Sequence, residues 1–198
     1  MTEPTLDIQQ QKKTIREQAH ANRKAQENKD DLSRRILAKF FALPEYKAAQ
    51  TVLFYVDVRA EVRTRHDLAE ALTHGKRILV PYCVDGELEL FHLTSMEELS
   101  LGAYKILEPR EDLRQRPEKK VDVSEVDLVM VPGVAFDSRG ARMGHGFGYY
   151  DKLLEHARPG TPLVALAFEC QMFPEIPVSD HDIFMSKILT EQNEYECS

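Results

Sequence analysis

The sequence has little of three features that would place it in a special class of protein. No run approaches the roughly 18 apolar residues of a membrane span, and segment 1–11 lacks the apolar core of a signal peptide. Basic residues are outnumbered, 26 against 33 acidic, so no overall positive field attracts nucleic acid or an anionic membrane. The few cysteines are far apart and never form Cys-x-x-Cys, which argues against a disulfide framework and a zinc knuckle. They are Cys83, Cys170 and Cys197.

What remains is the composition of an ordinary globular protein. Its 198 residues suffice for one domain, 1–198, that buries a core without disulfides or metals. We expect a cytoplasmic protein, a monomer or weak oligomer, whose partners are small molecules rather than nucleic acid or membrane. The net charge of −7 means that an anionic ligand needs a locally built site.

Two helices are predicted at the N-terminal end. Residues 9–30 are almost all helix-favouring polar residues and alanine, with Ile15 and Ala19 as a thin apolar stripe. The next helix has a stronger apolar face, and it should stop before Pro44 because the residue preceding a proline avoids the helical region.

Apolar runs then predict buried strands at 51–58, 77–81, 127–131 and 163–168. Between the first two, Thr64 and Asp67 match a capping box that opens a short helix, so this unit predicts a parallel right-handed crossover. Alternation at 88–93 predicts an edge or antiparallel strand, and the charged, proline-broken segment 109–120 predicts an exposed loop. Together these elements imply a three-layer α/β/α domain with a mainly parallel sheet, in which ligands bind at the carboxyl ends of the strands.

A glycine-rich stretch, 131–154, is the most informative part of the chain, because a buried strand runs into glycines and then into a helix near Tyr149. Glycines 140, 144, 146 and 148 allow positive φ and a close approach of backbone N–H groups to an anion, and Arg142 adds a forked cationic donor. Neither the P-loop pattern nor Gly-x-Gly-x-x-Gly is present. Two plainer interpretations stay open, a tight turn for the glycines and a first-turn helix carboxylate for Asp151.

The string from Pro132 to Asp151, PGVAFDSRGARMGHGFGYYD, resembles the signature of the 5-formyltetrahydrofolate cyclo-ligases, also called methenyltetrahydrofolate synthetases. Segments 12–16, 61–64, 102–109 and 177–182 resemble other parts of that family, so the resemblance spans nearly the whole chain. It implies a NagB/RpiA/CoA-transferase-like fold and a ligase that forms a C–N bond, with ATP and Mg²⁺ needed to close 5-formyltetrahydrofolate to 5,10-methenyltetrahydrofolate.

The resemblance also implies where the ligands bind, with the N-terminal helix, within 1–30, contributing to the ATP site. Lys12 and Arg16 are four residues apart and share a helix face, as a phosphate clamp requires. Metal ligands fall on Asp151 and Asp182, which suit Mg²⁺. The ATP-binding positions are Lys12, Lys13, Thr14, Ile15, Arg16, Arg142, Met143, Gly144, His145, Gly146, Phe147, Gly148, Tyr149 and Tyr150. The folate-binding positions are Val56, Glu61, His145, Gly146, Phe147, Gly148 and Tyr149.

Each of these side chains also has a plainer interpretation: a solvated basic face for Lys12 and Arg16, a solvated loop charge for Glu61. Two positions depart from the family pattern, Phe147 in place of glycine or a basic residue and Ser186 in place of an acidic one.

No side-chain nucleophile is expected, because phosphoryl transfer from ATP turns the formyl oxygen into a good leaving group. The alternatives are a sugar-phosphate isomerase or CoA-transferase-like enzyme and a nonenzymatic binding module. The two basic and two acidic positions argue against the first, and the acidic net charge against a nucleic-acid-associated form of the second.

Overall fold

A central eight-stranded sheet organises the computed structural model, which describes residues 4–102, 106–179 and 182–197. The strand order is β12-β11-β10-β7-β1-β2-β3-β6, with parallel pairing from β11 to β2 and antiparallel pairing at both edges. These strands are β1 (Thr51–Leu53), β2 (Arg77–Val84), β3 (Glu87–Leu93), β6 (Lys120–Val121), β7 (Leu128–Val131), β10 (Leu163–Leu166), β11 (Lys187–Leu189) and β12 (Glu194–Glu196).

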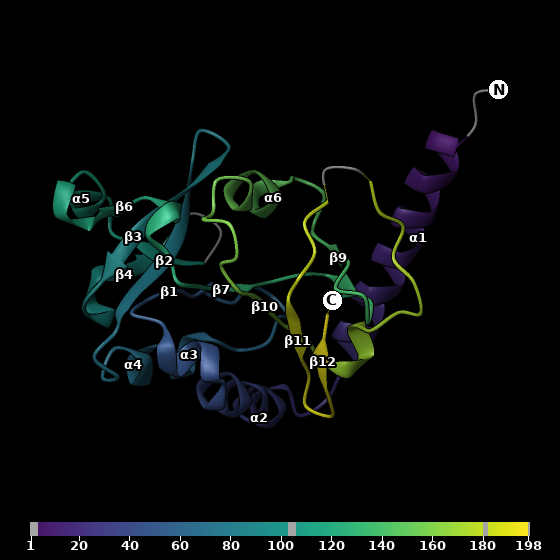
Figure 1. The fold of residues 1–198 in the computed structure, drawn as a ribbon, viewed down its shortest axis with the longest axis horizontal. Helices are drawn as coiled ribbons and strands as arrows, with labels where there is room; N and C mark the ends of the chain where they lie inside the picture. Colours follow the sequence, from purple (N-terminus) through teal and green to yellow (C-terminus); the bar gives the residue numbers. More distant parts are fainter. Residues whose placement is uncertain (1–3, 103–105, 180–181, 198) are drawn as a thin grey trace.

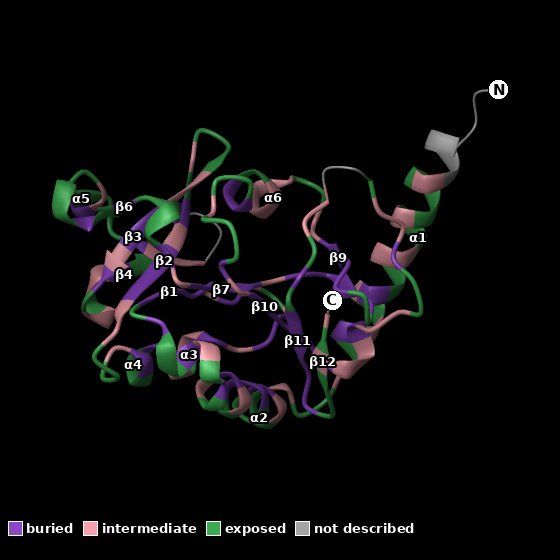
Figure 2. Ribbon diagram, in the orientation of Figure 1, coloured by how far each residue is buried: buried purple, intermediate pink, exposed green. Residues whose placement is uncertain are grey.

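Both faces of the sheet are covered, because alternate strand residues enter two different apolar clusters. Val52 and Leu128 belong to the cluster that takes in helices α2 (Lys29–Ala42), α3 (Pro44–Ala48) and α4 (Arg65–Ala71). Their neighbours Leu53 and Val129 belong to the cluster that takes in α6 (Tyr149–Leu154). Figure 1 shows α2, α3 and α4 on one side of the strands and α6 on the other, and Figure 2 shows the buried strands between them. The predicted three-layer α/β/α arrangement with a mainly parallel sheet is confirmed.

Helix α1 (Pro4–Ala25) lies apart from these two layers and packs at one end of the sheet (Figure 1). Its Ala19 is fully buried in a third small cluster with residues of the ribbon formed by β8 (Ala135–Phe136) and β9 (Arg142–Met143). The predicted single helix over 9–30 is wrong at its end: Asn28 adopts a left-handed conformation, with φ of 54°, and α2 begins at the next residue. The predicted stop before Pro44 is confirmed.

The remaining elements correct two further expectations. The first predicted strand, 51–58, pairs in the sheet only over Thr51–Leu53, although the chain stays largely buried beyond it. The charged segment 109–120 is no simple exposed loop, since it holds α5 (Glu111–Arg114) and the 3-10 helix η2 (Pro117–Lys119), with Leu113 and Lys119 buried. The chain also forms β4 (Leu99–Leu101), β5 (Leu107–Pro109) and the 3-10 helices η1 (Met96–Glu98), η3 (Val123–Glu125) and η4 (Glu169–Gln171).

Within the part of the chain that the structure describes, no helix is long and apolar enough to cross a membrane.

Candidate active site

The glycine-rich segment forms the predicted strand, loop and helix. Gly146 and Gly148 have φ of 101° and 68°, conformations that other residues rarely adopt, and Gly148 directly precedes α6. Gly140 also has positive φ, and a Cβ there would clash with the Met185 carbonyl, whereas Gly144 is not among the positive-φ residues. Residues 144–148 therefore form a loop whose backbone leads directly into α6.

Arg142 and Asp151, which the sequence assigned to different ligands, bond to each other. Arg142 is buried, and its Nη2 donates to Asp151 Oδ1 at 2.6 Å while its Nη1 donates to the Pro132 carbonyl at 3.3 Å. Its Nε is buried with no hydrogen-bond partner in the described part of the chain. Arg142 is thus placed to hold Asp151 rather than to stand open toward solvent.

One face of α1 carries basic side chains to this loop. Lys12 Nζ lies 2.8 Å from Asp182 Oδ2, which joins the helix to the C-terminal segment. Arg16 Nε donates to the Gly144 carbonyl at 3.0 Å, and its guanidinium carbon is 4.0 Å from where a Cβ on Gly146 would stand. The shared face predicted for Lys12 and Arg16 is therefore the face that packs on the rest of the protein, and a merely solvated basic face is ruled out.

The other positions of segment 12–16 lie elsewhere on α1. Lys13 and Thr14 are exposed, and the Thr14 hydroxyl donates to the Gln10 carbonyl at 3.1 Å. Ile15 packs against the third apolar cluster and, with Thr14 and Pro177, lines an open groove beside the helix. Of these three residues, Ile15 packs in the cluster that contains Met143, which directly precedes the glycine loop.

Asp151 and Asp182 offer carboxylate oxygens, which hard cations such as Mg²⁺ prefer. Each already pairs with one basic side chain, and those bonds fall on Oδ1 of Asp151 and on Oδ2 of Asp182. Burial raises the pKa of Asp182, but hydrogen bonds from Lys12 and Ser179 outweigh it and lower the pKa overall. No group of three or more His, Cys, Asp or Glu that could hold a metal occurs among the described residues. A cation held by two carboxylates would take its other ligands from phosphate and water.

Glu61 is a buried carboxylate, only 6% exposed, and not a solvated loop charge. Its Oε2 accepts a hydrogen bond from the Val58 backbone N–H at 2.9 Å. Its Oε1 lies 3.3 Å from His145 Nε2 and 4.0 Å from Arg23 Nη1. Glu61 thus connects the loop after β1 with the glycine loop and with α1.

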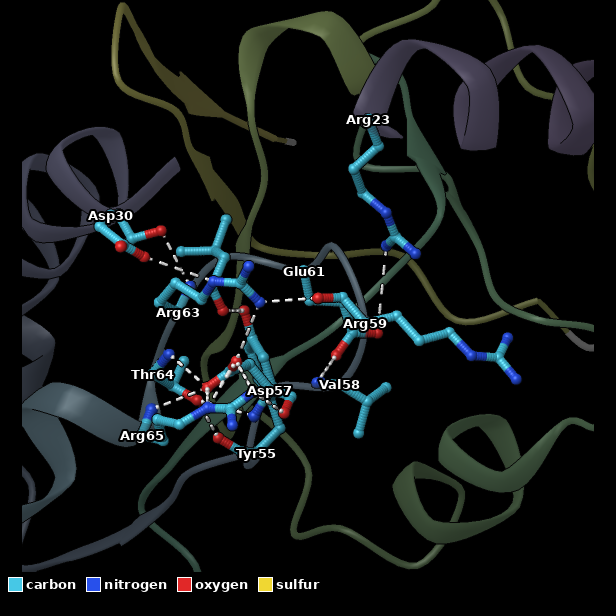
Figure 3. Close-up of polar contacts among 12 residues, drawn as sticks. Arg23, Asp30, Tyr55, Asp57, Val58, Arg59, Glu61, Arg63, Thr64 and Arg65 are labelled. Atoms are coloured by element: carbon cyan, nitrogen blue, oxygen red, sulfur yellow. Dashed lines mark hydrogen bonds and ion pairs between the residues drawn. The ribbon is translucent and has the colours of Figure 1, made fainter. Parts of the chain in front are cut away.

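Sequence reasoning missed Arg23 and His20, which extend the basic face of α1. Arg23 is 1% exposed, and Figure 3 shows its side chain reaching down from α1 toward Glu61. Its Nη1 donates to the Gly133 carbonyl at 3.2 Å, and burial lowers its pKa despite the nearby carboxylate. His20 stacks on His145 with ring centroids 5.4 Å apart, and burial together with Arg23 lowers the His20 pKa. Arg23 follows Lys12 and Arg16 at helical spacing, the one signal that could have singled it out.

The aromatic residues of the loop differ in their surroundings. Phe147 is 68% exposed and stacks on Tyr149, with ring centroids 5.5 Å apart at an interplanar angle of 15°. The Tyr150 hydroxyl is buried without a hydrogen-bond partner in the described part of the chain, and burial raises its pKa. Val56 is half-buried against the core beside β1. Ser186, the other departure from the family pattern, accepts a hydrogen bond at its hydroxyl from the Leu163 N–H at 2.9 Å.

A polar network around Asp57 fixes the loop that carries Glu61 (Figure 3). Asp57 Oδ1 accepts hydrogen bonds from the backbone N–H groups of Thr64 and Arg65 at 3.1 and 2.9 Å, and Oδ2 accepts one from Arg65 Nη2 at 2.7 Å. The Thr64 hydroxyl donates to the Tyr55 carbonyl at 2.6 Å and accepts from the Asp57 N–H at 3.1 Å. The predicted capping box of Thr64 with Asp67 is therefore wrong, since the Thr64 side chain bonds to residues before the helix and makes no cap.

Replacing Asp57 with Asn is expected to lower the free energy of unfolding by about 3 kcal/mol, because the side chain is fully buried and an amide cannot accept all the hydrogen bonds that the two carboxylate oxygens take from Thr64 and Arg65. Burial raises the pKa of Asp57, but the bonds from Arg65 outweigh it and lower the pKa below the ordinary 3.8. A lowered carboxyl pKa gives stability that is present above 3.8 and is lost as the pH falls through the folded value. Urea unfolding as a function of pH would measure both effects.

The control is Asp30→Asn, because Asp30 approaches Arg63 of the same network at 3.5 Å but its side chain is 66% exposed. It should change stability by well under about 1 kcal/mol. Equal effects of the two substitutions would contradict the assignment of Asp57 as the centre of the network.

Comparison with known proteins gives one consistent result. The sequence profile of the 5-formyltetrahydrofolate cyclo-ligase family matches residues 8–191. The 5-formyltetrahydrofolate cyclo-ligase of Mus musculus is 30% identical over 165 residues, covering 78% of this chain and 80% of the mouse chain. That of Escherichia coli K12 is 27% identical over 174 residues, covering 86% of this chain and 93% of the other.

Solved structures agree with the sequence comparison. The structure of Aquifex aeolicus 5,10-methenyltetrahydrofolate synthetase superposes with a TM-score of 0.81 at 31% identity, covering 93% of this chain and 92% of the other. A 5,10-methenyltetrahydrofolate synthetase from Mycoplasma pneumoniae shares the fold, with a TM-score of 0.71 at 19% identity, covering 91% of this chain and 98% of the other.

Proposed function

The chain belongs to the 5-formyltetrahydrofolate cyclo-ligase family, ligases that form a C–N bond, and we propose that it uses ATP and Mg²⁺ to close 5-formyltetrahydrofolate to 5,10-methenyltetrahydrofolate. The observation that carries this proposal is the docking of the basic face of α1 on the glycine loop, beside the buried carboxylate of Glu61. A cationic phosphate site and a carboxylate for a heteroaromatic ring thus lie next to each other. The products are the methenyl compound, ADP and phosphate.

The reaction needs activation of the formyl group, because an amide oxygen is a poor leaving group. The formyl oxygen attacks the γ-phosphorus of ATP, and the bond from that phosphorus to the bridging oxygen breaks to release ADP. Nitrogen 10 of the folate then attacks the formyl carbon and loses its proton, and the C–O bond breaks so that phosphate leaves with the former formyl oxygen. The chain needs no nucleophile of its own for these steps, and positioning with charge stabilisation supplies the catalysis.

In this proposal Lys12, Arg16 and the loop amides of 144–148 bind the triphosphate of ATP. Each side chain already has a bonding partner, Asp182 for Lys12 and the Gly144 carbonyl for Arg16, so both are ordered before ATP binds. Preordered donors lose less conformational entropy on binding. We assign Lys13 and Thr14, which are exposed, only the role of continuing the helix, whereas Ile15 packs α1 against the cluster that contains Met143.

Asp151 and Asp182 are the residues that would hold Mg²⁺. Arg142 orients Asp151, and Lys12 and Ser179 orient Asp182. When bound, the metal ion neutralises charge on the phosphoryl group in transfer. The pairing with Arg142 uses Oδ1 of Asp151 and the pairing with Lys12 uses Oδ2 of Asp182, which leaves the second oxygen of each carboxylate to a metal ion.

The folate site is proposed around Glu61, with Val56 and Tyr149 covering faces of the pterin ring. An ionised carboxylate can accept two hydrogen bonds from the amino group and ring N–H of such a heterocycle. His145, which lies 3.3 Å from Glu61 Oε1 and stacks on His20, stands beside this proposed site.

The experiment follows the near-ultraviolet absorbance of the methenyl product after mixing protein, 5-formyltetrahydrofolate and Mg²⁺ with and without ATP. We expect product only when ATP is present, with one ADP for each product molecule. Folded protein that forms no product under either condition would overturn the proposal, and product without ATP would overturn the role of the nucleotide.

A further inference from the structure

Arg59 has an unusual backbone conformation in the turn that carries Glu61. Its φ is 54°, in the left-handed region that favours glycine, asparagine and aspartate over a long side chain. The other positive-φ residues besides glycine in the described ranges are Asn28 and Asp85, and both are residue types that tolerate the left-handed conformation. Arginine at this position is therefore held in place against its local preference.

Three hydrogen bonds hold the turn in this shape, and two of them come from Glu61. The Glu61 N–H donates to the Val58 carbonyl at 3.1 Å, and Glu61 Oε2 accepts from the Val58 N–H at 2.9 Å. Arg63 Nη1 donates to the Arg59 carbonyl at 2.6 Å. The same carboxylate that we assign to the folate thus closes the turn that displays Arg59.

The Arg59 side chain stands apart from the charge network beside it. Arg63 and Arg65 direct their guanidinium groups to Asp57, whereas Figure 3 shows Arg59 extending away from these residues. Arg59 is exposed, and within the described ranges it has no hydrogen bond or ion pair through its guanidinium. A strained turn therefore presents a cation that the fold itself does not use.

The surroundings of Arg59 are rich in positive charge. Its charge acts on both His20 and Arg23, lowering the pKa of each after the larger effect of burial, and Arg16 also acts on His20. Three arginines thus stand around Glu61 in a chain whose net charge is −7: Arg59 lies in the turn that Glu61 closes, Arg23 Nη1 is 4.0 Å from Glu61 Oε1, and Arg16 bonds to the neighbouring glycine loop. A group of cations with one buried carboxylate among them is a site for an anion.

We propose that Arg59 is an anion-binding residue of the active site, which pairs with an anionic group of a substrate. This proposal rests on the function proposed above, whose two substrates each carry such a group. One source is the glutamyl carboxylates of the folate and the other is the triphosphate of ATP. Both are ligands for a guanidinium fork.

The test uses the full-length protein after wild-type turnover has been established, so that failure here leaves the proposed function standing. Arg59→Gln should raise the KM of the substrate whose anion it binds roughly tenfold or more, the loss expected for one charge-assisted pair. A folate analogue that lacks the glutamyl tail separates the sources. If the glutamyl tail is the partner of Arg59, the KM of the analogue is the same in Arg59→Gln and wild type. If the triphosphate is the partner, only the KM of ATP rises in Arg59→Gln.

Two further variants serve as controls, one for a general effect of removing a positive charge and one for an effect on folding. Arg116→Gln removes an exposed arginine that directly precedes η2, the short helix leading into β6. Figure 1 shows β6 at the opposite end of the molecule from α1, so both KM values should stay at wild type. Arg59→Gly removes the charge and relieves the positive φ, so its melting temperature should equal or exceed that of wild type while KM rises as in Arg59→Gln. If Arg59→Gln and Arg59→Gly both leave the two KM values within about twofold of wild type, below the loss of one such pair, the proposal is overturned.

Discussion

Replacing Glu61 with Gln is expected to raise the KM for 5-formyltetrahydrofolate about 10²-fold, the loss of roughly two charge-assisted hydrogen bonds, while the KM for ATP stays within a few-fold. A glutamine side chain has the same length and can still accept from the Val58 N–H, so the turn is preserved. What disappears is the charge that fixes the heterocycle. Steady-state kinetics with each substrate varied in turn would measure both constants.

The same substitution is expected to lower the free energy of unfolding by about 3 kcal/mol, because it leaves the Arg23 cation buried without its carboxylate. A second replacement separates stability from binding. In Glu61→Gln combined with Arg23→Gln the buried charge is gone, so most of the stability should return while the KM for the folate stays high. If the folate KM recovers together with stability, Glu61 has a structural role alone and our assignment of the folate site is wrong.

Replacing Asp151 with Asn is expected to lower kcat by about 10²-fold or more at ordinary Mg²⁺ concentrations, because one of two proposed metal ligands loses its charge. Raising the Mg²⁺ concentration should restore part of the rate. The measurement is a titration of activity with Mg²⁺, together with the shift in melting temperature that Mg²⁺ and ATP give jointly.

Asp112→Asn is the matched control, since Asp112 pairs with Arg110 on the surface and is 57% exposed. It should leave the Mg²⁺ titration unchanged. An alternative explanation for Asp151→Asn is that Arg142, with its buried Nε, loses its orientation. In that case the lost rate would not return at high Mg²⁺, and half-saturation by the metal would equal that of wild type, which would contradict the metal assignment.

The layers of the fold could be predicted because a short buried strand has a recognisable sequence pattern, a continuous run of apolar residues. At 127–131 and 163–168 the runs are apolar on both faces, and the structure places β7 and β10 there, with alternate residues in opposite clusters. The run at 51–58 has the same appearance but pairs only over Thr51–Leu53. Beyond Phe54, the backbone bonds to the side chains of Glu61 and Thr64 instead of to a neighbouring strand. No local sequence pattern predicts this change of hydrogen-bond partner.

The break between α1 and α2 could not be predicted for a related reason. The polar tract contains no glycine or proline to mark it, and Asn28 turns the chain by adopting a left-handed conformation that asparagine tolerates but does not require. Tertiary packing decides the position: Ala19 docks α1 on the β8–β9 ribbon, whereas Ile36 and Phe40 dock α2 on the sheet.

Individual residues of the candidate site could be proposed from the sequence, but the hydrogen bonds and ion pairs between them could not. Helical spacing placed Lys12 and Arg16 on one face, but their partners Asp182 and Gly144 are 170 and 128 residues away in sequence. The same holds for Arg142 with Asp151, which were separately assigned to phosphate and metal although they bond to each other. Arg23 was missed because a buried cation looks like any other basic residue of a polar helix until its carboxylate partner is found.

The central claim is that ATP activates the formyl oxygen so that it leaves as part of phosphate. The most direct test gives the wild-type protein 5-formyltetrahydrofolate that carries a heavy oxygen isotope in its formyl group, together with ATP and Mg²⁺. Our account predicts that the released phosphate carries the label, one atom for each methenyl product formed. If the label appears in water while the phosphate remains unlabelled, cyclisation proceeds without phosphoryl transfer to the formyl group, and the account is contradicted.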